Sequence, residues 1–152
     1  MMTILCAVDG SESAESALEF AIRLCEDSRA TLHVIAVKPP VLARGAGPSA
    51  LRAIDDEGGI AEIAEHAVLR AMLDGVEATP VLACGPVAEE IARAAVRLDA
   101  DLVVVGSRGH GALTSAVMGS VSRALLRCCE VPVAVIAHRR VREPEPIGAA
   151  ER

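Results

Sequence analysis

Five short runs of apolar residues recur along the chain, and each has the length of a buried strand. They are rich in Val, Ile, Leu and Ala, and most end at a glycine, a proline or a polar turn residue. A continuous apolar run with such boundaries is typical of a strand that is covered on both faces of a parallel sheet. The pattern predicts strands at residues 3–8, 31–37, 76–83, 102–105 and 131–137.

Between these runs, apolar residues recur every three or four positions, which is the spacing of one helical face. The spacing predicts helices over residues 12–25, 60–73 and 86–98, with Ser11 as the N-cap of the first and Pro86 at the first position of the third. Strands that alternate with helices form βαβ units, in which the crossovers are right-handed and the strands parallel.

Two prolines indicate which strands are outermost. Pro80 and Pro132 lie in the third and fifth runs, and proline lacks the N–H group that an inner strand donates. The strand order 3-2-1-4-5 satisfies both prolines and reverses direction between strands 1 and 4. We therefore predict an α/β fold: a single open five-stranded parallel sheet with helices on both faces, in a Rossmann-like arrangement.

The length of 152 residues suits one domain, which we place at residues 1–138. Residues 139–152 are rich in Arg, Glu and Pro, and we expect a disordered polar tail there. Residues 38–59 hold too many glycines and prolines for one regular element. That segment is either a surface connection, with a helical turn near residues 50–55, or a flap over a ligand.

Composition narrows the function classes. No apolar run reaches the length of a membrane span, and the net charge is −6 with no basic stripe interleaved with aromatics. We therefore expect neither a membrane nor a nucleic-acid partner. The first residues show no basic region followed by a cleavage site, so a cytoplasmic location is expected. The five cysteines lack CxxC spacing, which predicts reduced, apolar residues. Cys128 and Cys129 are the exception, because one of these two neighbours could face outward and meet an oxidant.

A glycine-rich segment follows the fourth predicted strand. Residues 106–119 contain four glycines and few side chains that would fill a core, and a helix begins at Ser120. The free N–H groups of such a loop, together with the positive end of the helix dipole, favour an anion. The segment is neither a Walker A loop, because no Gly-Lys-Ser/Thr follows, nor a complete Gly-x-Gly-x-x-Gly motif. We expect the buried face of this helix to contain Val121, Ala124, Leu125 and Cys128.

The carboxyl ends of strands 1 and 4 meet at the point where the strand order reverses, which is where open parallel sheets bind ligands. Those ends are Asp9 and Gly106. Asp9 is either a turn and cap residue or a carboxylate that takes ribose hydroxyls or the adenine amino group. In the second case Ala7, Val8 and Val34 would give apolar contact to the base.

The spacing Gly106-x2-Gly109-x9-Gly119-Ser120 resembles that of the universal stress protein family, and specifically of its ATP-binding members. The resemblance includes ILCAVDGSESAESAL near the start and LHVIAV in the second strand, and it covers residues 3–137. It implies an adenine nucleotide alpha hydrolase-like fold, ATP as the ligand and a homodimer formed through residues 131–137. The nucleotide contacts that the resemblance implies are Ala7, Val8, Asp9, Val34, Gly106, Gly109, Gly119, Ser120 and Val121. To these we add Val105, Arg108 and Ser122 as candidate contacts, although Arg108 is a departure from some relatives.

The glycine segment has no lysine near it, so Arg108, Arg123, backbone N–H groups or Mg²⁺ would neutralise the phosphates. Ser120 and Ser122 would either reach phosphate oxygens or be ordinary residues of a helix start. Two alternatives to a nucleotide-dependent regulatory module stay open. One is a nucleotide-free dimeric interaction module. The other is a slow ATPase or self-phosphorylating enzyme, for which the sequence offers no catalytic lysine or carboxylate cluster.

Overall fold

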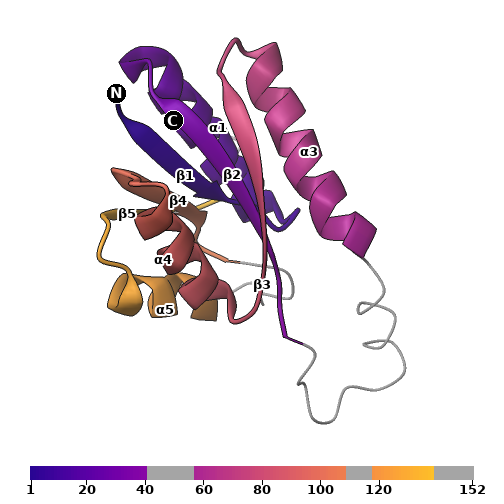
Figure 1. The fold of residues 1–152 in the computed structure, drawn as a ribbon, viewed down its shortest axis with the longest axis vertical. Coiled ribbons are helices and arrows are strands. Elements are labelled where there is room, and N and C mark those ends of the chain that lie inside the picture. Colours follow the sequence, from indigo (N-terminus) through magenta and orange to yellow (C-terminus); the bar gives the residue numbers. More distant parts are fainter. Residues whose placement is uncertain (41–56, 109–117, 139–152) are drawn as a thin grey trace, which may run out of the picture.

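The computed structural model describes residues 1–40, 57–108 and 118–138. Its sheet has five parallel strands in the order β3-β2-β1-β4-β5, which confirms the predicted fold class and strand order (Figure 1). The strands are β1 Thr3–Ala7, β2 Thr31–Lys38, β3 Ala78–Cys84, β4 Leu102–Gly106 and β5 Val133–Ile136.

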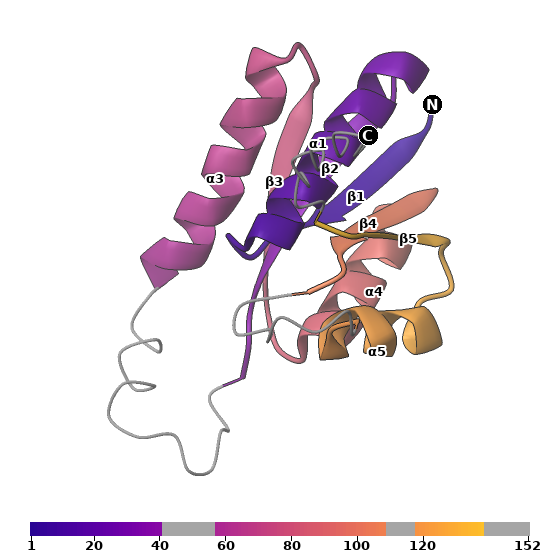
Figure 2. The same ribbon diagram turned by 180° about the vertical axis from the view of Figure 1, so that it is seen from behind.

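Helices cover both faces of the sheet, and opposite views of the molecule show them in turn (Figures 1 and 2). They are α1 Glu12–Ser28, α3 Glu57–Leu73, α4 Val87–Arg97 and α5 Ser120–Cys128. Apolar residues of α1 and α3 pack on one face, and those of α4 and α5 pack on the other. The first helix begins as predicted, because the Ser11 side chain accepts a hydrogen bond from the N–H of Ala14.

Successive residues of the inner strands point to opposite faces. In β1, Ile4 and Cys6 join the core under α1 and α3, whereas Leu5 joins the core under α4 and α5. These three side chains are fully buried, and burial of one large aliphatic side chain contributes about 1.5–3 kcal/mol to stability. Burial on both faces is the reason that the strands appear in the sequence as continuous apolar runs.

The two outermost strands are β3 and β5, and a proline lies in the first and directly before the second. Pro80 lies in β3, at one edge, as predicted. Strand β5 forms the other edge, and all four of its residues are half-buried. Pro132 precedes β5 rather than lying inside it, and its carbonyl accepts the N–H of Val103 at 2.9 Å. The second proline therefore marks the entry to an edge strand.

Three local predictions need correction. The Gly58-Gly59 pair does not break the chain, because α3 begins at Glu57 and the two glycines lie in its first turn. Packing of Ile60 and the following apolar residues against the sheet outweighs the helix cost of about 1 kcal/mol per glycine. Pro86 is the N-cap of α4 and not its first helical residue. The predicted helical turn near residues 50–55 and the alternative flap lie within residues 41–56, which are outside the described residues.

The cysteines divide into two groups. Cys6 and Cys25 are buried, and burial raises the pKa of the Cys25 thiol to about 11 and that of Cys6 further. Both are therefore protonated thiols near neutral pH, and their burial agrees with the apolar role predicted for them. Cys128 is exposed, which agrees with the exception made for it, but Cys84 is exposed as well. Cys84 ends the edge strand β3, where one side of the strand has no neighbour to cover it.

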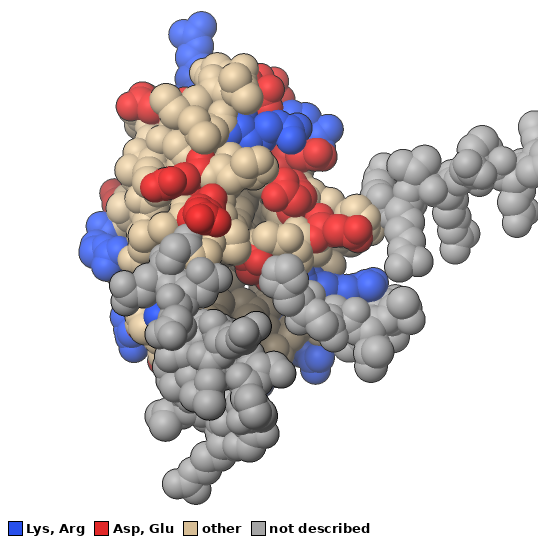
Figure 3. All heavy atoms as spheres, turned by 90° about the vertical axis from the view of Figure 1, so that its right-hand side faces the viewer, with Lys and Arg blue, Asp and Glu red and all other residues tan. Residues whose placement is uncertain are grey.

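The surface of the described residues carries both exposed apolar and charged side chains. The exposed apolar ones include Leu69, Met72 and Leu73 of α3. Acidic side chains gather across the middle of the face seen in Figure 3, and most basic ones on that face lie toward its outline. Among the described helices, none is both long and apolar enough to cross a lipid bilayer.

Candidate functional site

A cavity of about 550 Å³ lies beyond the carboxyl ends of β1, β2 and β4. Its apolar side comes from the end of β2 and from the first turns of α3 and α4, through Ile35, Val37, Ile60, Val87 and Ile91. Its polar side comes from the residues after β1 and β4 and from the start of α5. The cavity thus joins an apolar wall to a polar rim at the crevice where the strand order reverses.

The structure brings most of the predicted site residues to this cavity. Its lining includes Ala7, Val8, Asp9, Val105, Gly106, Arg108, Gly119, Ser120, Val121 and Ser122. Gly109 lies outside the described residues. Val34 is fully buried in the core under α1 and α3 and does not line the cavity, whereas its neighbours Ile35, Ala36 and Val37 do.

The start of α5 supplies backbone donors to the cavity rim. The N-cap is Gly119, with φ −64° and ψ 163°, and it makes no side-chain capping bond. The first turn of α5 carries no acidic residue, in contrast to Glu12 and Glu15 in α1 and to Glu89 and Glu90 in α4. The first N–H groups of a helix have no partner within it, and the dipole makes this end positive. The α5 start therefore favours an anion in the cavity.

Two hydrogen bonds hold the α5 start against the end of β4. The N–H of Gly119 donates to the carbonyl of Ser107 at 2.7 Å, and the hydroxyl of Ser122 donates to the carbonyl of Gly106 at 2.9 Å. Ser122 is 3% exposed, so its hydroxyl braces the fold at this point. Ser120 is exposed at the rim. The two serines that looked alike in the sequence thus have different surroundings.

This arrangement also corrects the predicted face of α5. Leu125 is fully buried as predicted, but Val121 is 37% exposed and Cys128 is exposed, while Ser122 takes a buried position. The helix start points its apolar Val121 toward the cavity, and the carbonyl of Gly106 satisfies the buried hydroxyl.

Gly106 is required by packing as well as by its place on the rim. A Cβ added there would lie 2.6 Å from the backbone carbon of Ser13 and 2.6 Å from its Oγ. Such contacts are far inside van der Waals distance, so α1 can approach the end of β4 only because this residue has no side chain. Sequence spacing alone does not reveal this reason, since Ser13 is distant in the chain.

Asp9 acts as a turn residue, which is one of the two roles that the sequence predicts for it. Its Oδ1 accepts the N–H of Ser11 at 2.9 Å, which shapes the turn between β1 and α1. The residue is nevertheless exposed and lies on the cavity rim. The Asp9 carboxylate thus stabilises the turn and also lies where a ligand in the cavity would contact it.

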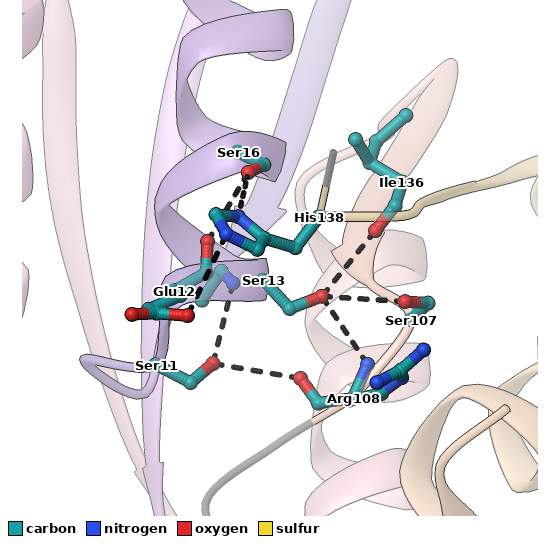
Figure 4. A network of polar contacts seen from close by, with 9 residues as sticks. Ser11, Glu12, Ser13, Ser16, Ser107, Arg108, Ile136 and His138 are labelled. Carbon is teal, nitrogen blue, oxygen red and sulfur yellow. Dashed lines mark hydrogen bonds and ion pairs between the residues drawn. The ribbon is translucent and has the colours of Figure 1, made fainter. Parts of the chain in front are cut away.

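Arg108 lies on the cavity lining, and hydrogen bonds of its backbone hold it in place (Figure 4). Its N–H donates to the Oγ of Ser13 at 3.2 Å, and its carbonyl accepts the hydroxyl of Ser11 at 3.5 Å. Arg123 donates instead to the carbonyl of Met118 at 2.9 Å. Of the two arginines considered for charge neutralisation, Arg108 is the one on the cavity lining.

Sequence reasoning missed the apolar residues that the helices contribute. Ile60 and Ile63 from α3, and Val87 and Ile91 from α4, line the cavity. Each pair lies near the start of a helix that follows a strand end, and that position is visible in the sequence. The apolar residues near the start of a helix that follows a strand could therefore have been predicted as part of the cavity lining.

Residues 1–137 match the sequence profile of the universal stress protein family. The chain belongs to this family. A universal stress protein of Thermus aquaticus is 35% identical over 136 positions, covering 88% of this chain and 97% of that protein. One from Mycobacterium tuberculosis is 31% identical over 159 positions, which cover 94% of this chain but 49% of that protein. This universal stress protein chain therefore spans about half the length of the mycobacterial relatives it matches.

Solved structures share the fold over nearly the whole chain. A universal stress protein family member from Burkholderia pseudomallei is 33% identical with a TM-score of 0.66, covering 88% of this chain and 94% of that chain. A universal stress protein in complex with cAMP is 26% identical with a TM-score of 0.65, covering 89% and 96%. An Arabidopsis thaliana protein with AMP bound is 20% identical with a TM-score of 0.69, covering 91% and 93%, and shows the common fold alone.

Proposed function

We propose that this universal stress protein binds an adenine nucleotide, ATP in particular, in the cavity beyond β1, β2 and β4. Occupancy of that cavity would make the protein a ligand-dependent regulatory module of a stress response. The observation that carries the proposal is the start of α5, which has no side-chain cap and no acidic first-turn residue, and which lines a cavity with an apolar wall.

The division of the cavity matches the two halves of a nucleotide. Ile35, Val37, Ile60 and Ile91 offer an apolar surface for a flat base. The first N–H groups of α5 after Gly119, the hydroxyl of Ser120 and the guanidinium of Arg108 would offer donors for phosphate oxygens. The relative solved in complex with cAMP, at 26% identity, supports an adenine nucleotide as the class of ligand.

Asp9 is the residue we assign to the adenosine half. Its exposed carboxylate on the rim would accept hydrogen bonds from ribose hydroxyls or from the adenine amino group. Together with Ala7 and Val8 it would give the first strand a part in base recognition, as the resemblance implies. Val34 is fully buried and does not line the cavity, so Ile35 and Val37 would make the apolar contact from β2.

Mg²⁺ enters the proposal on the nucleotide. Within the described residues, no three His, Cys, Asp or Glu side chains gather in a way that would hold a metal ion. Any Mg²⁺ would be carried by the nucleotide, with phosphate oxygens and several water molecules as its ligands. Neutralisation by the chain would come from Arg108 and the dipole of α5.

A thermal shift measurement tests the proposal. With ATP at one hundred times its dissociation constant, linkage gives about 2.7 kcal/mol of added stability. For a domain of this size the melting temperature should rise by roughly 5 to 10 °C. A triphosphate without adenine should raise it less, because the apolar wall would be poorly filled.

Gly119→Val is the matched control, since φ and ψ at Gly119 are in the extended region and accept a side chain. The branched side chain would occupy the space where phosphate approaches the backbone, so the shift should disappear while the protein stays folded. An equal shift in both proteins, or none in the wild type at millimolar ATP, would reject nucleotide binding and favour a nucleotide-free interaction module.

We also propose a homodimer in which two copies pair through residues 131–137. Support comes from β5, an outermost strand whose four residues are all apolar and only half-buried. An apolar edge of this kind pairs readily with a copy of itself about a two-fold axis. Sedimentation at micromolar concentration should give a dimer mass, and Val133→Glu should give a folded monomer by circular dichroism. A monomer mass for the wild type contradicts the proposal.

A further inference from the structure

The first turn of α1 contacts both the rim of the cavity and the end of the edge strand β5. Figure 4 shows Ser11 and Ser13 reaching Arg108 on one side, while Ser13 also reaches the carbonyl of Ile136. Arg108 lines the cavity and Ile136 is the last residue of β5. One helical turn thus contacts two regions to which the proposed function assigns different partners.

Ser13 is the central residue of these contacts. Its side chain is nearly buried, at 5% exposure, and its Oγ accepts the N–H of Arg108 at 3.2 Å. The same Oγ lies 3.4 Å from the carbonyl oxygen of Ile136, to which it donates, and 3.4 Å from the Oγ of Ser107. A buried hydroxyl is costly to leave without partners, so these contacts fix the three segments relative to one another.

A second link between cavity and edge consists of backbone groups. The N–H of Gly119 donates to the carbonyl of Ser107 at 2.7 Å, and the N–H of Ser107 donates to the carbonyl of Ile136 at 2.8 Å. A single residue thus connects the cap of α5, where we place the phosphates, to the end of β5. Hydrogen bonds in such a chain polarise and strengthen one another.

Close packing keeps this junction from absorbing a displacement. Gly106 has no space for even a Cβ against Ser13, so a shift of the β4 end would move α1. Beyond β5, His138 is attached to the same helix turn, with Nδ1 3.0 Å from the Oγ of Ser16 and Nε2 3.5 Å from Oε2 of Glu12 (Figure 4). The start of α1 therefore contacts the chain at Ile136 and again two residues later, at His138.

We infer that the first turn of α1, with Ser13 as its positioning residue, couples the nucleotide cavity to the β5 edge. Occupancy of the cavity strengthens pairing of β5 with a second copy of the chain, and pairing strengthens nucleotide binding by the same factor. This inference rests on the proposed function, because it assigns a regulation to the proposed site.

The test measures the dimer dissociation constant by sedimentation equilibrium, with and without saturating ATP, on the whole chain. Wild type should dimerise at least about fivefold more tightly with ATP. Ser13→Ala should reduce that ratio to less than about twofold, because the Oγ that joins Arg108 to Ile136 is lost. Ser28→Ala is the matched control, since Ser28 lies at the far end of α1 and its hydroxyl donates to Leu24 within the helix; it should keep the wild-type ratio.

ATP affinity of dilute, monomeric protein is measured on the same samples. No ATP binding by wild type rejects the proposed function and the inference with it. Three other outcomes overturn the inference and leave nucleotide binding intact. Wild type binds ATP but its dimer dissociation constant does not change, or it forms no dimer at all, or Ser13→Ala shows the same ratio as wild type. If Ser13→Ala fails to fold, Ser107→Ala removes the hydroxyl pair while keeping both backbone bonds of Ser107, and it should lower the ratio in part.

Discussion

The helices α1 and α5 follow neighbouring strands and lie on opposite faces of the sheet, and their first turns differ in how the N–H groups are capped. In α1 the Ser11 side chain caps the N–H of Ala14, and two acidic residues lie in the first turn. In α5 the N-cap is Gly119, which makes no side-chain capping bond, and the first turn of the helix carries no acidic residue. A helix start that satisfies its own donors gains stability, whereas one that leaves them open can bind an anion.

Giving α5 an acid of its own should produce the largest effect. Gly119→Asp would cap the first turn and place a carboxylate where phosphate is expected. Two like charges about 4 Å apart near a protein surface repel by about 4 kcal/mol, and a hundredfold loss of affinity needs only about 2.8 kcal/mol. Calorimetric titration should therefore show ATP affinity lowered at least about a hundredfold, with an unchanged or higher melting temperature.

Gly119→Asn separates the charge from the cap. Asparagine caps a helix about as well as aspartate but carries no charge, so it should keep far more of the affinity. If the Asp and Asn variants bind ATP equally well, the phosphates do not lie at the start of α5.

Removing the cap of α1 should have a smaller effect, and on stability instead of affinity. Ser11→Ala loses the bond to Ala14, which costs about 1 kcal/mol and lowers the melting temperature by roughly 2 to 4 °C. ATP affinity should change by less than about twofold, since Ser11 is not on the cavity lining. If the variant loses more free energy of ATP binding than free energy of folding, the nucleotide lies over the start of α1 instead.

The smallest effect should come from Ser120→Ala, which removes one exposed hydroxyl from the rim. A single neutral hydrogen bond is worth about 1 kcal/mol, so ATP affinity should fall by roughly fivefold or less. Stability should not change. In Ser122→Ala the pattern should be reversed, because the buried Ser122 hydroxyl braces the carbonyl of Gly106. Identical behaviour of the two variants would contradict their assigned roles.

The fold could be predicted because its determinants are local or compositional. Runs covered on both faces showed the strands, and Pro80 pointed to an edge. The crevice followed from strand order alone, and most predicted site residues reached it. Val34 did not, because side chains alternate along a strand: Val34 points to the face under α1 and α3, and Ile35 points to the other. A continuous apolar run does not show which of two neighbours faces a ligand.

What the sequence did not reveal depends on contacts between distant segments. Ser13 meets Ser107 across 94 positions and Ile136 across 123. The tight approach at Gly106 and the inward turn of Ser122 arise from the same junction. Hydrophobic periodicity does not predict the roles of these residues, because each role depends on contact with a residue that is distant in the sequence. Tertiary packing likewise outweighed the low helix propensity of the Gly58-Gly59 pair.

The unequal edges of the sheet set a limit on aggregation. Pro80 removes an N–H group from β3, while β5 is free of proline. Two copies that pair through β5 bury the same edge in both, so the only edges left at the rim of the joint sheet are the two β3 strands. An edge that contains proline is a poor template for further strands. If the chain dimerises through β5 as proposed, assembly would therefore close at two copies and resist growth into fibres.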